Sequence, residues 1–478
     1  MTSPSIHKDL VNCCAIETTR SMINEMGDFL FSILVDESHD NSIKEQMIVV
    51  LRFVDKSRQV KERLLDICHI ADTCAQSLKD AIDAIFSTHG LSISSLRGQG
   101  YDGASNMSGE FNGLKALILR ENPCAMYIHC FAHQLQLAVV SVAHRNVMLS
   151  DLFNMLAIIV NLVGASCKCV DALRTSYHVE ILERLNIEKL SGGTGQFQEM
   201  SLARPGDTRW GSHLKTVTHF ISMFNAIIDV LENISEDGII LQQKLMAIRQ
   251  MDTMQDFQFV FSLHFMFEIL AITDDLSQAL QKKDQDIQNA MRLLKLYSIL
   301  QELNDRFPET TTKLFTCISC LSPRDSLAAF DVCKLVRLAQ LYPMDFNSEE
   351  LLLFRPQLDK FLMLMRMDEV FFNLKSISCV AQKLVETGSS CYFPLVYRPI
   401  TLVLILPVAT ASVERVFSAM NLIKNDLRNK MGDELLNDNL VAYMERDLFM
   451  KLENETILQH FQNMQPHRIQ LSKLAISK

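Results

Sequence analysis

The chain lacks any hydrophobic run long enough to cross a bilayer. A membrane-spanning helix needs about 20 consecutive apolar residues, and the longest apolar segment, Pro399–Ala411, is shorter. Basic residues are also outnumbered, because 46 Lys and Arg stand against 56 Asp and Glu, for a formal net charge of −10. Bulk charge therefore does not support nucleic-acid binding, and any such contact depends on local basic patches. We expect no membrane partner.

The sequence also lacks a secretory leader and a regular cysteine framework. Its 13 cysteines are odd in number and scattered, which is typical of reduced thiols in a nuclear or cytoplasmic protein and not of a secreted one. Cys130 and His133 form a C-x-x-H pair, and Cys317 and Cys320 form a lone C-x-x-C pair. Structural zinc takes four ligands at suitable spacing, so we predict no structural zinc.

Residues 1–145 alternate between strand and helix patterns. The continuous apolar run Phe29–Val35 stops at Asp36, as a buried strand does. We predict further strands over Met47–Val54, Val60–Ile70, Leu91–Leu96 and Ala125–Cys130, and helices over Asp72–Thr88, about 109–120 and Phe131–Val142. Three strands in a meander, followed by a helix and a fourth strand, give the order of a ribonuclease H-like fold. The ends of the first and fourth strands are neighbours in that order, so Asp36 and Asp102 are expected to be neighbours too.

Long helical patterns rich in Leu, Met and Phe dominate the middle of the chain. The predicted fold class is therefore α/β with a large all-α insertion, in which a helical domain interrupts a ribonuclease H-like core. We predict four segments: the N-terminal part of the core over 1–145, the helical insertion over 146–393, the C-terminal part of the core over 394–449, and a polar tail over 450–478.

Three acidic residues occur in settings that suit metal-dependent phosphoryl transfer. Asp36 ends a strand, Asp102 lies near the end of the glycine-rich segment RGQGYDG, and Glu414 lies in the helical pattern ATASVERVFSAM. Two aspartates on neighbouring strands and a helical glutamate can hold a metal pair that assists in-line displacement. Carboxylates suit Mg²⁺ or Mn²⁺. The glycine-rich segment lacks the Lys-Ser/Thr ending of a phosphate-binding loop.

Each acid also has an ordinary structural explanation. Asp36 is equally suited to cap the polar turn that follows it, and Glu37 and Asp40 are rival metal ligands. Asp102 is an expected residue in a glycine-rich turn, and Glu414 is an expected residue on a helix surface.

The chain resembles hAT-type (hobo/Activator) DNA transposases, and more closely the plant TTF-type/MYM-type zinc-finger proteins derived from them. Five segments carry the resemblance, in order: LVDESHD, RGQGYDGASNMSGEFNGLK, HCFAHQLQLA, DTRWGSH and LPVATASVERVFSAMNLIKNDLRNKMGDELLNDNLVAY. The resemblance covers about residues 6–449. It implies a ribonuclease H-like core, a helical insertion and a C-terminal dimerisation region. It also implies that Asp36, Asp102 and Glu414 are the catalytic, metal-binding acids of a two-metal DDE-type enzyme.

Candidate nucleic-acid contacts lie outside the three acids. The resemblance implies that Trp210, the single tryptophan, stacks an unpaired base while Arg209 contacts phosphate, and that His133 lies near the active site. Lys424 and Arg428 form part of a small basic face. The alternatives are a packed tryptophan and solvated surface charges.

The predicted function is that of a hAT transposase-derived protein with dimerisation activity and a residual site for metal-dependent DNA strand cleavage or transfer. The alternative is a domesticated, non-enzymatic dimerising factor that binds DNA or protein. We expect a homodimer or higher oligomer, with DNA as the further candidate partner and no small-molecule substrate. The near-continuous apolar run 400–406 supports self-association, because it exceeds what one helix face buries. No zinc finger precedes the family-like sequence, which leads us to expect a truncated copy or an incomplete gene model.

Overall fold

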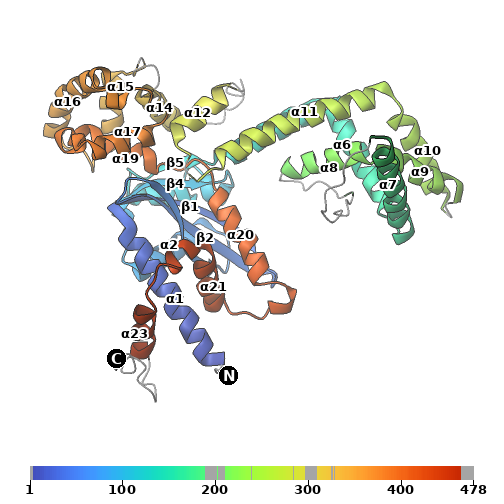
Figure 1. Ribbon diagram of the computed structural model, residues 1–478, viewed down its shortest axis with the longest axis horizontal. Coiled ribbons are helices and arrows are strands. Elements are labelled where there is room, and N and C mark those ends of the chain that lie inside the picture. Colours follow the sequence, from blue (N-terminus) through green and yellow to red (C-terminus); the bar gives the residue numbers. More distant parts are fainter. Residues whose placement is uncertain are drawn as a thin grey trace. The chain divides into compact units, whose positions relative to one another are not determined.

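The computed structural model describes residues 4–188, 202, 210–237, 240–283, 285–296, 309–323, 327 and 329–464. The chain divides into two compact units: Met1–Gln134 together with Ala279–Lys478, and Leu135–Gln278. It is mostly helical, with one small mixed sheet in the first unit (Figure 1). The second unit is shorter than the predicted helical segment 146–393, because residues 279–393 group with the sheet.

Five strands form the sheet in the order β3-β2-β1-β4-β5. Their bounds are β1 Met26–His39, β2 Glu45–Asp55, β3 Val60–His69, β4 Leu96–Tyr101 and β5 Met126–His129. The first three strands form an antiparallel meander, and β4 and β5 continue the sheet in parallel with β1. The predicted adjacency of the first and fourth strands is confirmed by the pairing of β1 with β4.

The prediction for the fourth strand was wrong in its position. Residues Ile93–Ser95 form a short 3-10 helix, and the strand runs over the residues that we assigned to a glycine-rich turn. Gly98 and Gly100 are buried in β4, where an added Cβ would come within 2.9 Å and 2.5 Å of Pro407 respectively. The glycines are therefore needed for the close approach of another chain segment, and not for a turn.

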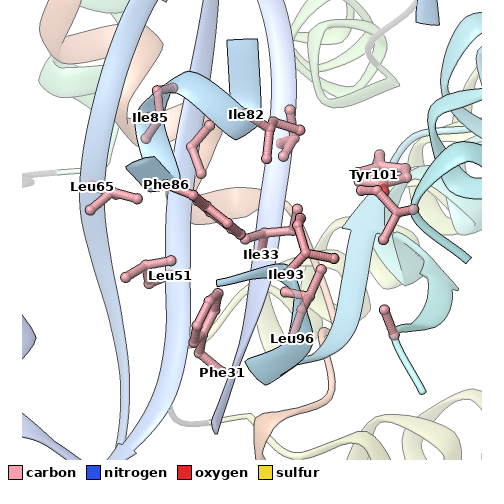
Figure 2. Packing of buried hydrophobic residues seen from close by; sticks show 14 of the residues in the cluster. Phe31, Ile33, Leu51, Leu65, Ile82, Ile85, Phe86, Ile93, Leu96 and Tyr101 are labelled. Carbon is pink, nitrogen blue, oxygen red and sulfur yellow. The ribbon is translucent and has the colours of Figure 1, made fainter. Parts of the chain in front are cut away.

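One face of the sheet packs against α2 (Ala75–His89) and α4 (Leu114–Glu121). Alternate strand residues face this side, because successive side chains of a strand point to opposite faces. Figure 2 shows Phe86 of α2 against Phe31 of β1, and the two rings meet edge to face at 5.5 Å. The apolar residues that alternate with these along β1, such as Leu34, pack on the opposite face of the sheet. Because both faces are covered, β1 has a continuous apolar sequence.

The opposite face packs against α20 (Ala411–Ile423) and α21 (Asp433–Met444). The edge strand β3 does not present all its backbone donors to solvent. The N–H of Leu64 donates to Glu445 at 2.7 Å, and the N–H of Ile67 donates to Asn437 at 3.1 Å. These side chains satisfy backbone groups that would otherwise be open for strand pairing with another molecule.

Further helices complete the first unit. They are α1 Pro4–Glu25, α3 Ser105–Ser108, α12 Ile287–Leu296, α14 Glu309–Ile318, α15 Val332–Gln340, α16 Ser348–Met367, α17 Ile377–Glu386, α18 Ser389–Tyr392, α19 Pro394–Ile405, α22 Arg446–Phe449 and α23 Asn454–Met464. Helix α5, Phe131–Arg145, begins in the first unit and continues into the second. Part of the predicted polar tail is thus helical, and Phe461 of α23 packs with Cys13 of α1.

The prediction that the apolar run 400–406 exceeds what the chain can bury is wrong. Helix α19 contacts β1, β2 and β4 as well as α16 and α17. Ile400 and the run from Leu402 to Leu406 are consequently buried within the first unit. The run is apolar all round because it lies between the sheet and other helices, so it leaves no surface for a partner.

The second unit consists of helices in the part that the structure describes. They are α6 Val147–Val163, α7 Cys167–Glu188, α8 Trp210–Ser222, α9 Phe224–Asp237, α10 Leu241–Met254 and α11 Phe257–Leu280, which ends just inside the first unit. Across the described helices, none is by itself long and apolar enough to span a membrane, and two bent helix pairs pass that test only jointly.

Candidate functional site

Asp36 and Asp102 lie on neighbouring parallel strands. The last β1–β4 pair in register is Leu34 with Gly100, and both acids follow two residues later. Because side chains alternate with a period of two, Asp36 points to the same face as Leu34. Leu34 belongs to the core cluster that contains α20. The strand register therefore directs the Asp36 carboxylate toward the face covered by the helix that carries Glu414, and Asp102 follows directly after the end of the neighbouring strand β4.

Glu414 lies in the first turn of α20, and the segment before this helix is held on both sides. Pro407 packs over the glycines of β4. On the other side, the N–H of Phe131 donates to the carbonyl of Val408 at 3.0 Å, and the N–H of Thr410 donates to the Cys130 sulfur at 3.3 Å. These contacts fix where α20 begins, and hence the position of Glu414.

The electrostatics of Asp36 show that the acids act on one another. Burial, together with the charges of Asp102, Glu37 and Glu414, raises the pKa of Asp36 to about 7 against the lowering effect of a backbone hydrogen bond. Like charges that converge in this way disfavour ionisation. A strongly raised carboxyl pKa in a cluster of acids is typical of functional sites.

Glu37 remains a rival ligand, whereas Asp40 does not. Glu37 accepts a hydrogen bond from Asn106 at 2.8 Å, and its other carboxylate oxygen is buried without a hydrogen-bond partner among the described residues. Asp40 is engaged by Lys424 at 2.6 Å and by Gln46 at 3.0 Å. Its carboxylate therefore serves the interior ion pair and is not available for a metal.

Two histidines lie beside Asp102. The ring of His129 packs against Gly103, where an added Cβ would approach it to 2.6 Å. His133 of α5 stacks on His129 with the ring centroids 5.5 Å apart. His133 therefore lies against His129, which packs on the residue that follows Asp102.

A buried network that the sequence did not reveal supports the start of α20. Arg52 of β2 donates to Glu62 of β3 at 2.6 Å, and Glu62 also accepts from the hydroxyl of Ser412. Arg415 donates to the same hydroxyl at 2.6 Å. No local motif links these residues, because they come from two strands and a helix more than 300 positions later in the chain.

The remaining predicted nucleic-acid contacts fare differently. The prediction that Lys424 contacts nucleic acid is wrong, because its side chain is 1% exposed and pairs with Asp40. Arg428 is exposed. Arg209 lies outside the described residues, and Trp210 is the first residue of α8, with a side chain that is likewise outside the description.

The donor set suits a hard divalent cation, since the three acids supply carboxylate oxygens and repel one another without one. Their arrangement is not yet that of a coordination sphere. Within the described ranges, no group of three or more His, Cys, Asp or Glu side chains is placed to hold a metal ion.

Two family profiles match the chain. Residues 1–113 match the ZMYM1/FAM200 RNase-like domain, and residues 381–448 match the hAT family C-terminal dimerisation region. Through the second region the chain is related to hAT-family proteins. Asp36 and Asp102 lie in the first matched segment, and Glu414 lies in the second.

The chain is also similar to a curated human protein, the 52 kDa repressor of the inhibitor of the protein kinase. The two are 22% identical over 311 residues, which is 63% of this chain. The match spans 38% of the human protein's length. The similarity supports common descent of the matched segments.

Proposed function

We propose that the chain keeps a ribonuclease H-like core, interrupted by residues 135–278, which binds Mg²⁺ or Mn²⁺ through Asp36, Asp102 and Glu414. The strand order, with β4 parallel to β1, supports this assignment. The observation that carries the site is the β1–β4 register, which sets Asp36 and Asp102 at the ends of neighbouring strands, and the raised pKa of Asp36 supports it. A bound metal pair would supply stabilisation of the attacking and leaving oxygens in phosphoryl transfer on DNA.

The second candidate is a non-enzymatic factor, nuclear or cytoplasmic, that dimerises and binds DNA or protein. It is favoured by the absence, among the described side chains, of a preformed metal-binding group. The matched human relative is named as a repressor, which is a regulatory role. Both candidates share the hAT dimerisation region.

Metal binding tests the site on which the first candidate rests. We expect the full chain to bind Mn²⁺, as measured by calorimetry or by loss of the free-ion electron paramagnetic resonance signal. Asp36→Asn, Asp102→Asn and Glu414→Gln should each weaken binding by about tenfold or more, since each removes a charged oxygen ligand. Glu110→Gln is the matched control, because Glu110 is exposed and lies shortly after Asp102.

Equal Mn²⁺ binding by the wild type and all three variants would refute the metal site. Binding without cleavage of DNA substrates would leave a metal-binding but non-catalytic protein and support the second candidate.

We also propose that two copies associate through the hAT region. With α19 buried, the apolar side chains left exposed there include Leu422 and Leu427, the latter 95% exposed. The β1–β2 turn lies against this part of the chain, because the Ser42 hydroxyl donates to the Asn429 carbonyl at 2.5 Å. Exposed apolar side chains of this kind are typical of association surfaces.

Light scattering of the purified chain at micromolar concentration tests this proposal. We expect a dimer or larger species, and Leu422→Lys/Leu427→Lys should shift it toward the monomer, since each lysine would have to be desolvated at the interface. Leu352→Lys on α16 is the control, because Leu352 is 78% exposed but lies outside the matched region. A wild-type monomer, or equal effects of both changes, would contradict this surface.

A further inference from the structure

A cavity of about 520 Å³ lies within the second unit, between α6, α10 and α11. Its size falls in the range of small-molecule sites, roughly 300–1,000 Å³. It is formed entirely by residues of this unit, so it is separate from the acids of the sheet. The proposed metal site makes no use of it.

The most informative residue of this cavity is Gln250 of α10. Its side chain lines the cavity, is only 6% exposed, and has an amide oxygen without a hydrogen-bond partner among the described residues. Buried amides are nearly always hydrogen-bonded, because an unmade bond leaves the cost of desolvation uncompensated. A buried amide that lines a cavity therefore indicates a ligand that completes its hydrogen bonds.

The cavity walls suit a flat, uncharged ring. Met148, Met155 and Met246 contribute thioether side chains, and Phe259 contributes an aromatic one. Thioethers adapt to irregular shapes and make favourable contacts with aromatic rings. Such walls would cover the faces of a ring and leave its edge to the Gln250 amide.

Charged groups of the lining disfavour a phosphate and favour amino groups. Asp151 and Asp256 line the cavity together with one cation, Arg249. The lining is thus net negative, and carboxylates accept hydrogen bonds from exocyclic amines. A free phosphate or a nucleotide bound by its phosphates does not fit this set.

We propose that this cavity binds an adenine-type base. A glutamine amide offers one donor and one acceptor side by side, which matches the N6 amino group and N7 of adenine in a bidentate pair. The base belongs either to a free nucleoside or to a strand of nucleic acid, and the recognition chemistry is the same in both cases.

An aromatic ladder next to the cavity offers a place for neighbouring bases of a strand. Phe257, Phe261 and Phe265 are exposed on α11 and stack in succession, with ring centroids 6.0 Å and 5.9 Å apart. Gln258 and Ser262 of the same helix line the cavity, and each follows a ladder residue by one position, about 100° around the helix. The ladder therefore lies on the helix face adjacent to the cavity.

The test uses the full chain in EDTA, so that no metal contributes. Adenosine binding is measured by calorimetry, and labelled oligo(dA) and oligo(dT) are compared by fluorescence anisotropy. We expect adenosine or oligo(dA) to bind saturably and oligo(dT) to bind more weakly. Gln250→Leu should reduce the binding by about tenfold or more, since it removes the bidentate pair.

The leucine variant also reports on its own folding. Replacing an unsatisfied buried amide by an apolar group should leave the melting temperature equal or higher. Gln242→Leu, the same change at an exposed position of α10, should bind as the wild type does.

Binding of oligo(dA) without adenosine binding would assign the site to a strand, and binding of both would show that the free nucleoside suffices. Equal binding by the wild type and Gln250→Leu, equal binding of oligo(dA) and oligo(dT), or no binding of either adenine probe would overturn the proposal.

Discussion

Asp36→Asn is expected to stabilise the metal-free protein at pH 8 and to leave its stability nearly unchanged at pH 4. Burial, together with the charges of Asp102, Glu37 and Glu414, raises the pKa of Asp36 from 3.8 to about 7 in the folded chain. In the unfolded chain the carboxyl group ionises near its ordinary pKa. Asparagine cannot ionise, so the variant avoids the cost of a buried, repelled carboxylate.

The direction follows from proton binding. Between pH 3.8 and about pH 7 the folded state keeps a proton on Asp36 that the unfolded state has released. The free energy of unfolding therefore falls as pH rises through this window and stays lower above it. A shift of about three pKa units corresponds to at most about 4 kcal/mol, so we expect the variant to gain about 2–4 kcal/mol at pH 8.

Chemical denaturation in EDTA at the two pH values measures this difference. Glu110→Gln, which removes an exposed carboxylate from the same region, should change little at either pH. Added Mn²⁺ should reverse the order, because a ligand that binds the folded state stabilises only the chain that can hold it. An Asp36→Asn variant less stable than the wild type at pH 8 would contradict the proposed repulsion.

The parts of the fold that follow short-range patterns were predictable from the sequence. The apolar run before Asp36 predicted β1, and the helix expected over 72–88 appears as α2, because both patterns reflect burial against local neighbours. The opening helix α1 was not predicted. The fourth strand was misplaced because Gly98 and Gly100 read as turn residues, whereas Pro407, more than 300 residues away, is what requires them.

The candidate site, too, was predictable only where it depends on local patterns or strand order. The strand order alone predicted that Asp36 and Asp102 are neighbours, and their adjacency follows from the β1–β4 register. The partners of Glu62, Cys130 and Lys424 could not be read from the sequence, because each contact joins segments that are distant along the chain. Charge spacing indicated an exposed Lys424, and only the packing of α20 on the sheet shows that it is buried.

Lys424→Met is expected to destabilise the first unit by about 3–5 kcal/mol, the range for breaking a buried ion pair by removing one partner. Lys424 and Asp40 have side chains that are 1% and 0% exposed, with the nitrogen and oxygen 2.6 Å apart. Burial alone would raise the pKa of Asp40, but hydrogen bonds from Lys424 and Gln46 outweigh burial and lower it. Without the lysine, a carboxylate remains in the interior with its main counter-charge gone.

The double variant Asp40→Asn/Lys424→Met distinguishes this cause from lost packing. Removing both charges leaves no buried ion without its partner, so the double variant should recover most of the lost stability. Lys430→Met is the control, because Lys430 is exposed and should contribute within about 0.5 kcal/mol. The free energies of unfolding come from denaturant titration at pH 7. If Lys424→Met is as stable as the wild type, the Lys424–Asp40 pair does not hold α20 to the end of β1.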